Sequence, residues 1–457
     1  MGVTLNSQSP PTQSPARGAR LSLILLLTIN LFNYIDRYVL ASVEPKIREH
    51  FFPGAASHAA SAKDELAAAM AKTGSLATAF LLSYMIAAPI FGWLAGRMSR
   101  WVLVGISVAV WSLASGASGL AGTFALLVLT RCFVGIGEAG YGPSAPTIIS
   151  DLYPIERRGA VLAWFYMAIP VGSALGYALG GIVIKHYSWR VPFFLVVPPG
   201  LLLATWAFFM KNPRRVFTTA PKATDLRSEN SRVLDYAHTP SKAHLKDYLN
   251  VLRIPSYVLD TAGMAAMTFA IGGFSFWMPA YLVDQRHAGK LEDVNLYFGG
   301  IMVVAGIAAT LLGGWLGDFF RRRTAGAYFI VSAAGILLSV VFIVLMIQTP
   351  FPSAWLWLFF AVFFLFLNTG PSNTILANVT HPSVRANAFA LNILIIHALG
   401  DAISPPLLGA IAGRSWDAAL YVVCAVMALA SVFWFWGARF LQRDSDRVEQ
   451  ASAPAAG

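Results

Sequence analysis

The sequence GPSAPTIISDLYPIERRGA at residues 142–160 returns in altered form as GPSNTILANVTHPSVRANA at residues 370–388. Both copies begin with Gly-Pro-Ser and then carry Pro, Arg and Ala at identical intervals. A shorter match pairs GWL at residues 92–94 with GWL at residues 314–316, and each copy leads into a short basic turn. Two matches in the same order indicate an internal duplication, so the second half of the chain is predicted to repeat the fold of the first.

The composition excludes an ordinary soluble protein. Hydrophobic residues make up 57% of the 457 residues and charged residues only 12%, whereas soluble domains carry about 25% charged residues. The net charge of +11 is explained by Lys and Arg at the ends of membrane spans, so no nucleic-acid partner is expected. The two cysteines lie in apolar runs, and we therefore expect neither disulfides nor a metal or other cofactor.

The apolar runs predict an all-α membrane protein with twelve transmembrane helices, each of about 20 residues. Together with the duplication, they predict two six-helix pseudo-symmetric bundles that can rock about a site at their interface. The predicted organisation is a disordered N-terminal tail, an N-terminal bundle, a cytoplasmic linker, a C-terminal bundle and a C-terminal tail, at residues 1–16, 17–210, 211–253, 254–441 and 442–457.

Basic residues predict the orientation of the chain. If the N-terminus is cytoplasmic, 22 of the 33 Lys and Arg fall on the cytoplasmic side and nine on the outer side, with Arg37 and Arg131 inside spans. Cytoplasmic loops of membrane proteins carry the excess of Lys and Arg. Both termini are therefore predicted to lie in the cytoplasm.

The turns after the second and eighth spans resemble the signature of the major facilitator superfamily. GWLGD at residues 314–318, followed by three arginines, fits its Gly-x-Leu-x-Asp pattern, whereas GWLAGR at residues 92–97 has Gly96 in place of the acid. The resemblance implies the major facilitator fold and alternating access. It also implies a conformational gating role for Asp318, Arg97 and Arg322, with the first half lacking the usual latch carboxylate.

Within that superfamily, three strings resemble a bacterial-type member of the spinster family. They are NYIDRY at residues 33–38, RCFVGIGE at 131–138 and HALGDA at 397–402. The resemblance implies transport of sphingosine 1-phosphate or lysophospholipids, coupled to protons in some members. We accordingly expect a monomeric, multi-pass protein of the cell (inner) membrane, with the lipid bilayer and a lipid-like small molecule as its partners.

Among the ionisable residues inside predicted spans are Asp36, Arg37, Arg131 and Glu138. An unpaired charge there costs several kcal/mol and so marks a functional site. The depths of the residues along their helices predict that Asp36 pairs with Arg131. Arg37 and Glu138 are then left for water, for substrate or for each other. Two interpretations stay open at this stage: a static cluster that joins the first and fourth helices, or a site in which arginines receive an anionic headgroup.

Other polar and aromatic residues are candidates for the cavity wall. Asn30 and Asn33 share a stripe of the first helix with Arg37, next to Tyr34, although asparagines also form hydrogen bonds between helices. Further candidates from the second half are Thr369, Asn373, Trp277 and Met278. The last two are equally explained as anchors at the membrane interface.

Proton coupling, if present, needs a group that titrates inside the membrane. Glu138 is the preferred carrier of the proton and Asp36 the second choice. His397 and Asp401 lie four residues apart and share a helix face, so they form either a further protonation site or a hydrogen bond within the helix.

The sequence thus predicts a secondary active transporter for an amphiphilic anionic solute. An uncoupled facilitator, or a major facilitator carrier of another small organic anion, remains an alternative. A membrane lipid enzyme is a weaker alternative, because no metal-spaced histidine cluster or Ser-His-acid arrangement is recognisable in the chain.

Overall fold

The computed structural model describes residues 18–56, 62–95, 97–153, 161–162, 164–210, 249–381 and 384–452. In this part of the chain all regular structure is helical, and twelve helical segments are long and apolar enough to cross a membrane. The predicted fold class and number of spans are thereby confirmed. Gly96, the tail at 1–16 and most of the predicted linker, residues 211–248, lie outside the described residues.

The N-terminal half supplies the first six spans. Its helices are α1 (Ala19–Phe51), the short η1 (Pro53–Ala56), α2 (Ala62–Ala95), α3 (Arg100–Leu120), α4 (Phe124–Tyr141), α5 (Ser144–Leu152), α7 (Ala168–Ile184), α8 (Val191–Leu195) and α9 (Val197–Phe209). The fourth span is α4 followed by α5, and the sixth is α8 followed by α9.

The C-terminal half supplies the other six. Its helices are α11 (Pro255–Ala280), η4 (Tyr281–Gln285), α12 (Leu291–Arg321), α13 (Ala327–Gln348), α14 (Ala354–Phe366), α15 (Thr369–Val379), α16 (Arg385–Ile396), η5 (His397–Asp401), α17 (Ser404–Ala412), α18 (Trp416–Gly437) and α19 (Leu441–Ser452). Both η4 and η5 are π-helical segments within longer helices.

The C-terminal end of the chain differs from the sequence prediction. The predicted C-terminal tail contains α19, whose Asp444 is buried and accepts a hydrogen bond of 3.0 Å from the backbone N–H of Ser256 at the start of α11. This contact satisfies one of the free N–H groups of a helix N-terminus and attaches α19 to the bundle.

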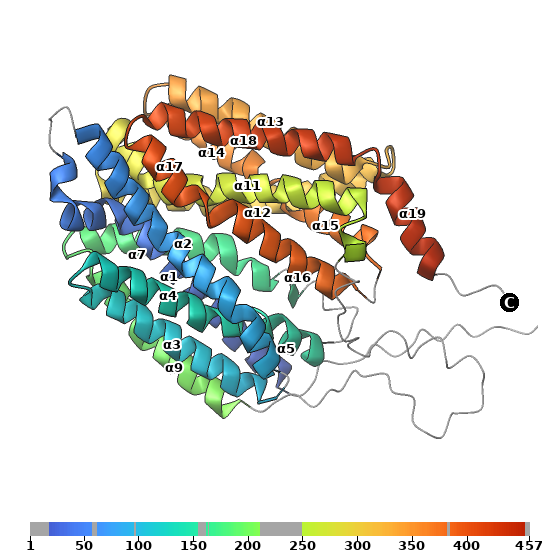
Figure 1. Cartoon of the computed structure of the whole chain (residues 1–457), viewed down its shortest axis with the longest axis horizontal. Helices are drawn as coiled ribbons and strands as arrows, with labels where there is room; N and C mark the ends of the chain where they lie inside the picture. Colours follow the sequence, from blue (N-terminus) through green and yellow to red (C-terminus); the bar gives the residue numbers. More distant parts are fainter. Residues whose placement is uncertain are drawn as a thin grey trace, which may run out of the picture.

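The two halves converge at one end of the molecule. Following the orientation that the basic residues predict, we call this the outer end; it carries residues 52–56 and 286–290, and the inner end carries residues 322–326 and 438–440. In Figure 1 the C-terminal half lies above the N-terminal half, and their helices meet at the outer end on the left and diverge towards the inner end on the right.

Helix crossings with little side-chain bulk join the halves near the outer end. α2 packs on α17 and α7 packs on α12. At the first crossing, a Cβ atom on Gly74 would lie 2.5 Å from the backbone oxygen of Pro405 and 2.6 Å from its carbonyl carbon. Small residues let helices approach closely in membranes, and here the backbone leaves no room for any side chain.

We therefore predict that Gly74→Val prevents full closure of the outer end. A cysteine introduced at Ala77, which lines the central cavity, should then react several-fold faster with a membrane-impermeant maleimide added from outside. The background needs Cys132→Ser, because Cys132 is partly exposed. Gly92→Val is the matched control, since a Cβ atom at Gly92 meets nothing within 4 Å. Equal labelling of both variants would contradict this prediction.

Candidate functional site

A cavity of about 220 Å³ lies between the two halves, roughly halfway along the helices. The N-terminal half contributes Tyr34, Arg37 and Arg131 to its wall, and the C-terminal half contributes His397 and Asp401. The remaining wall is mostly apolar. Cations on one side therefore face a carboxylate and an imidazole on the other.

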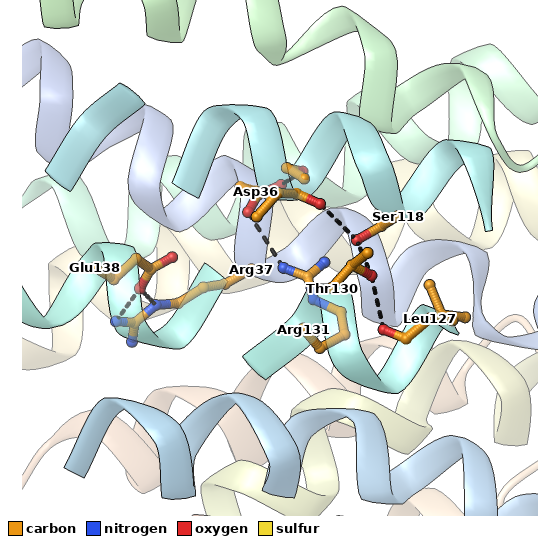
Figure 2. A network of polar contacts seen from close by, with 9 residues as sticks. Asp36, Arg37, Ser118, Leu127, Thr130, Arg131 and Glu138 are labelled. Carbon is orange, nitrogen blue, oxygen red and sulfur yellow. Dashed lines mark hydrogen bonds and ion pairs between the residues drawn. The ribbon is translucent and has the colours of Figure 1, made fainter. Parts of the chain in front are cut away.

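Asp36 and Arg131 form the deeper of two ion pairs between α1 and α4 (Figure 2). Arg131 Nη2 lies 3.3 Å from Asp36 Oδ2, and each side chain is only 2% exposed. The Ser115 hydroxyl of α3 donates a second hydrogen bond to Asp36. Nε and Nη1 of Arg131 are buried without a partner among the described residues. Arg131 also lines the cavity.

Arg37 and Glu138 form the second pair, which is more open to the cavity. Arg37 Nη2 lies 2.5 Å from Glu138 Oε2, and Arg37 Nε donates to the same oxygen at 2.7 Å. Glu138 is 1% exposed whereas Arg37 is 26% exposed, so Arg37 is the more open partner of the pair. The rings of Tyr34 and Phe80 flank this guanidinium at 5.1 and 4.8 Å from their centroids.

Helix geometry explains why two adjacent residues of α1 reach two levels of α4. Consecutive helical residues point about 100° apart, so Asp36 and Arg37 leave α1 in different directions. Arg131 and Glu138 are seven residues apart on α4, which is almost two turns and places them on one face about 10 Å apart along the axis. The two pairs therefore fix α1 and α4 in both rotation and register.

The C-terminal half presents His397 and Asp401 from the π-helical segment η5. His397 Nδ1 lies 2.9 Å from Asp401 Oδ1, and both side chains are about one quarter exposed. The pair is thus within one helix, as one of the two sequence interpretations has it, yet it also lines the cavity. π-Helical turns occur frequently at functional sites.

Comparisons with known proteins agree with this architecture. The family model described as Major Facilitator Superfamily matches residues 26–405 and 294–457. Protein spinster homolog 1 of Xenopus tropicalis is 32% identical over 93% of this chain and 82% of its own length. The sphingosine-1-phosphate transporter SPNS2 of Danio rerio is 32% identical over 92% of this chain and 84% of its own length.

This chain belongs to the spinster family of the major facilitator superfamily. Among solved structures, a bacterial homologue of the human lysosomal transporter spinster, in an inward-facing and unoccupied conformation, matches with a TM-score of 0.74 and 20% identity. The match covers 96% of this chain and 99% of that chain and supports the fold. The relatives are named as transporters, so the chain is a carrier and the membrane-enzyme alternative is set aside.

Several residues that the sequence predicts at the cavity lie elsewhere in the structure. Asn30 donates to the carbonyl of Phe165 at 2.8 Å, which is the bond between helices that the sequence left as an alternative. Asn33 is buried in α1. Thr369 and Asn373 bond to carbonyls of their own helical segment and do not line the cavity.

Trp277 and Met278 lie in the core of the C-terminal half, with 4% and 1% exposure. Trp277 Nε1 donates to the Pro405 carbonyl at 2.7 Å. The structure therefore differs from both sequence interpretations, because these two side chains face their own bundle and neither the cavity nor the membrane surface.

The three predicted gating residues lie at the inner end. Asp318 accepts a hydrogen bond of 2.9 Å from the Tyr328 hydroxyl, within the C-terminal half. The Arg97 guanidinium stacks over the Trp93 ring at 3.7 Å, within the N-terminal half. Arg322 is exposed. In this conformation, the contacts of Asp318 and Arg97 therefore stay within their own halves.

Sequence reasoning missed a second charged cluster, at the outer end. Arg48 of α1 lies 2.5 Å from Asp284 of η4 and 3.6 Å from Glu44 of its own helix. The spacing of four between Glu44 and Arg48 was visible in the sequence as a pair on one helix face. The sequence gives no local signal for Asp284, because it lies 236 residues away from Arg48 along the chain.

The burial of Asp36 gives a prediction for protein stability. Arg131→Ala leaves the carboxylate buried without its cation, which destabilises by about 3–5 kcal/mol. We expect the purified variant to lose several degrees in its thermal unfolding midpoint. The double variant Asp36→Asn with Arg131→Met should recover most of that loss, because neither charge remains. An Arg131→Ala protein as stable as the wild type would contradict this assignment.

Proposed function

We propose that this carrier moves an amphiphilic, anionic, lipid-like solute of the sphingosine 1-phosphate or lysophospholipid class by alternating access. The observation that carries the proposal is the pair of arginines at the cavity, Arg37 with 26% of its side chain exposed and Arg131 with two nitrogens that have no partner among the described residues. Guanidinium groups match phosphate oxygens with two parallel hydrogen bonds. The name of the Danio rerio relative points to the same chemical class.

The size of the cavity fits a headgroup. Its volume is about 220 Å³. A phosphorylated headgroup fits this space, and an acyl or sphingoid chain would extend beyond it along the apolar wall. Tyr34 and Phe80 would then flank the phosphate-bound Arg37. The other predicted residues act through helix packing in this conformation: Asn30, Asn33, Thr369, Asn373, Trp277 and Met278.

We further propose an inward-facing state, because the hydrogen bonds between the halves, among the residues that the structure describes, lie at the outer end and the middle, as for Arg48–Asp284 and Arg414–Asp64. Asp318, Arg97 and Arg322 would engage across helices when the inner end closes. The excess of Lys and Arg on one side of the membrane supports cytoplasmic termini. A location in the cell (inner) membrane fits a bacterial-type carrier. A monomer already contains both rocking halves.

Arg37→Ala tests the substrate class. Loss of a charge-assisted contact costs about 1.5–3 kcal/mol, which is roughly ten- to hundredfold in affinity. We expect that loss for a sphingoid phosphate or lysophospholipid, measured by binding to the purified carrier and by flux into liposomes. Arg439→Ala is the control, because Arg439 is exposed near the inner end. Unchanged affinity in Arg37→Ala, or preference for a small organic anion, would overturn the proposed substrate class.

Energy coupling is a separate prediction. We propose that Glu138 carries the coupled proton, because it is buried, is paired with Arg37 and has one oxygen without a partner among the described residues. Glu138→Gln keeps the shape of the protonated acid, so it should keep solute exchange and lose stimulation by a pH gradient. Uphill transport with wild-type pH dependence would exclude Glu138 and leave Asp36 and the His397–Asp401 pair. Wild-type flux that ignores the gradient would identify a facilitator.

A further inference from the structure

The charged cluster at the outer end holds one cation and two carboxylates. Arg48 Nη2 lies 2.5 Å from Asp284 Oδ2, across the interface between the halves. Arg48 Nε lies 3.6 Å from Glu44 Oε1, one turn earlier on α1. Glu44 is 1% exposed, Arg48 9% and Asp284 34%. If Glu44 and Asp284 were both ionised, their two negative charges would exceed the single positive charge of Arg48. One of the two negative charges would then lie on the buried Glu44.

The groups around Glu44 do little to stabilise a negative charge on its carboxylate. Its Oε1 accepts a hydrogen bond of 2.7 Å from the Thr73 hydroxyl of α2. Its Oε2 is buried and has no partner in the part of the chain that the structure describes. A separation of 3.6 Å from Arg48 is beyond hydrogen-bonding distance. A buried carboxylate with one hydroxyl partner is much less favourable than the neutral acid in the same place.

Among the residues that the structure describes, no cation other than Arg48 faces Glu44. The charged groups that face it are Arg48 from α1 and Asp284 from η4, and α2 contributes the uncharged Thr73. A hollow of about 910 Å³ outside the cluster is lined by further charged residues, Lys46, Glu49, Lys63, Lys290 and Glu292 among them. Arg48 and Asp284 reach this hollow, whereas Glu44 is not part of its wall.

Opening of the outer end must separate Arg48 from Asp284, because they belong to different halves. Asp284 is tied to the C-terminal half through Arg286, which donates to the carbonyls of Met346 and Ile347 at 2.8 and 2.7 Å. Arg48 travels with α1. After separation, the carboxylate within reach of Arg48 is Glu44, at the favourable spacing of four residues on the same helix.

We propose that Glu44 is a proton-binding site of the outer gate. While the outer end is closed, Arg48 pairs with Asp284 and Glu44 is the neutral acid. When the gate opens, Asp284 withdraws into water and the O–H bond of Glu44 breaks. The proton passes to the outer water, and the electron pair stays on the carboxylate that now binds Arg48. The mechanism requires only that the two halves alternate, and it does not depend on the identity of the solute.

This exchange makes closure of the outer gate pH-dependent. The closed state binds one proton more than the open state, so acid favours the closed state. As the pH rises through the range in which only the closed state holds the proton, the ratio of closed to open molecules falls by about tenfold per pH unit. Protons outside would thus act on the gate directly, without entering the central cavity.

The test measures outer-end distances in the full-length carrier, in nanodiscs and without solute, between pH 5 and pH 8. Spin labels on cysteines at Tyr187 and Ser353, both exposed at the outer end, report closed and open populations in a Cys132→Ser background. Glu44→Gln imitates the neutral acid. We expect it to match the wild type at pH 5 and to be more closed at pH 8, by up to about tenfold per pH unit.

Two further variants make the result specific. Glu49→Gln removes an acid from the same helix, but Glu49 is 66% exposed and paired with Lys46, so it should follow the wild type at every pH. Asp284→Asn should shift the gate towards open and flatten its pH response, since Arg48 then stays with Glu44 in both states. A constant offset of Glu44→Gln from the wild type, or no difference at any pH, would overturn the proposal. If Glu44→Gln does not fold, a wild-type pH response in Asp284→Asn would overturn it equally.

Discussion

The requirement that every charge inside the membrane has a partner governs the N-terminal half. Asp36 and Arg37 leave α1 in different directions, and each meets an opposite charge on α4. An ion pair of this kind gains little net stability over apolar packing, but removal of one partner is strongly unfavourable. Two such pairs at different heights hold α1 and α4 in one register. The N-terminal half can therefore move as a unit during rocking, and its two arginines keep their place at the cavity.

The duplication produced two halves of similar fold and different chemistry. The N-terminal half brings two guanidinium groups to the cavity, and the C-terminal half brings His397 and Asp401 from η5. A headgroup bound between them would meet a cationic wall on one side and a polar, partly acidic wall on the other. Because these walls belong to different halves, both contact the solute only when the halves have the right relative position. Recognition and rocking are coupled by that geometry.

The sequence was sufficient for the fold because a membrane tolerates few alternatives. Backbone groups in lipid must be satisfied within helices, so apolar length alone predicts the spans, and the repeated motifs predict the two bundles. Depth along a helix also predicted the Asp36–Arg131 pair. It could not predict Arg37–Glu138, which depends on helix tilt, nor the position of Trp277, because a buried membrane helix is apolar on all sides and its pattern does not reveal which face meets the cavity.

The ion pairs differ in how they respond to rocking. Asp36–Arg131 and Arg37–Glu138 lie within one half, so their distances need not change when the halves move. Arg48–Asp284 joins the halves, so it exists in one access state and is lost in the other. A contact of the second kind biases the equilibrium between states directly through its own strength. The central charges are thus suited to selecting a solute, and the outer charges are suited to setting the proportion of carriers that are open to the outside.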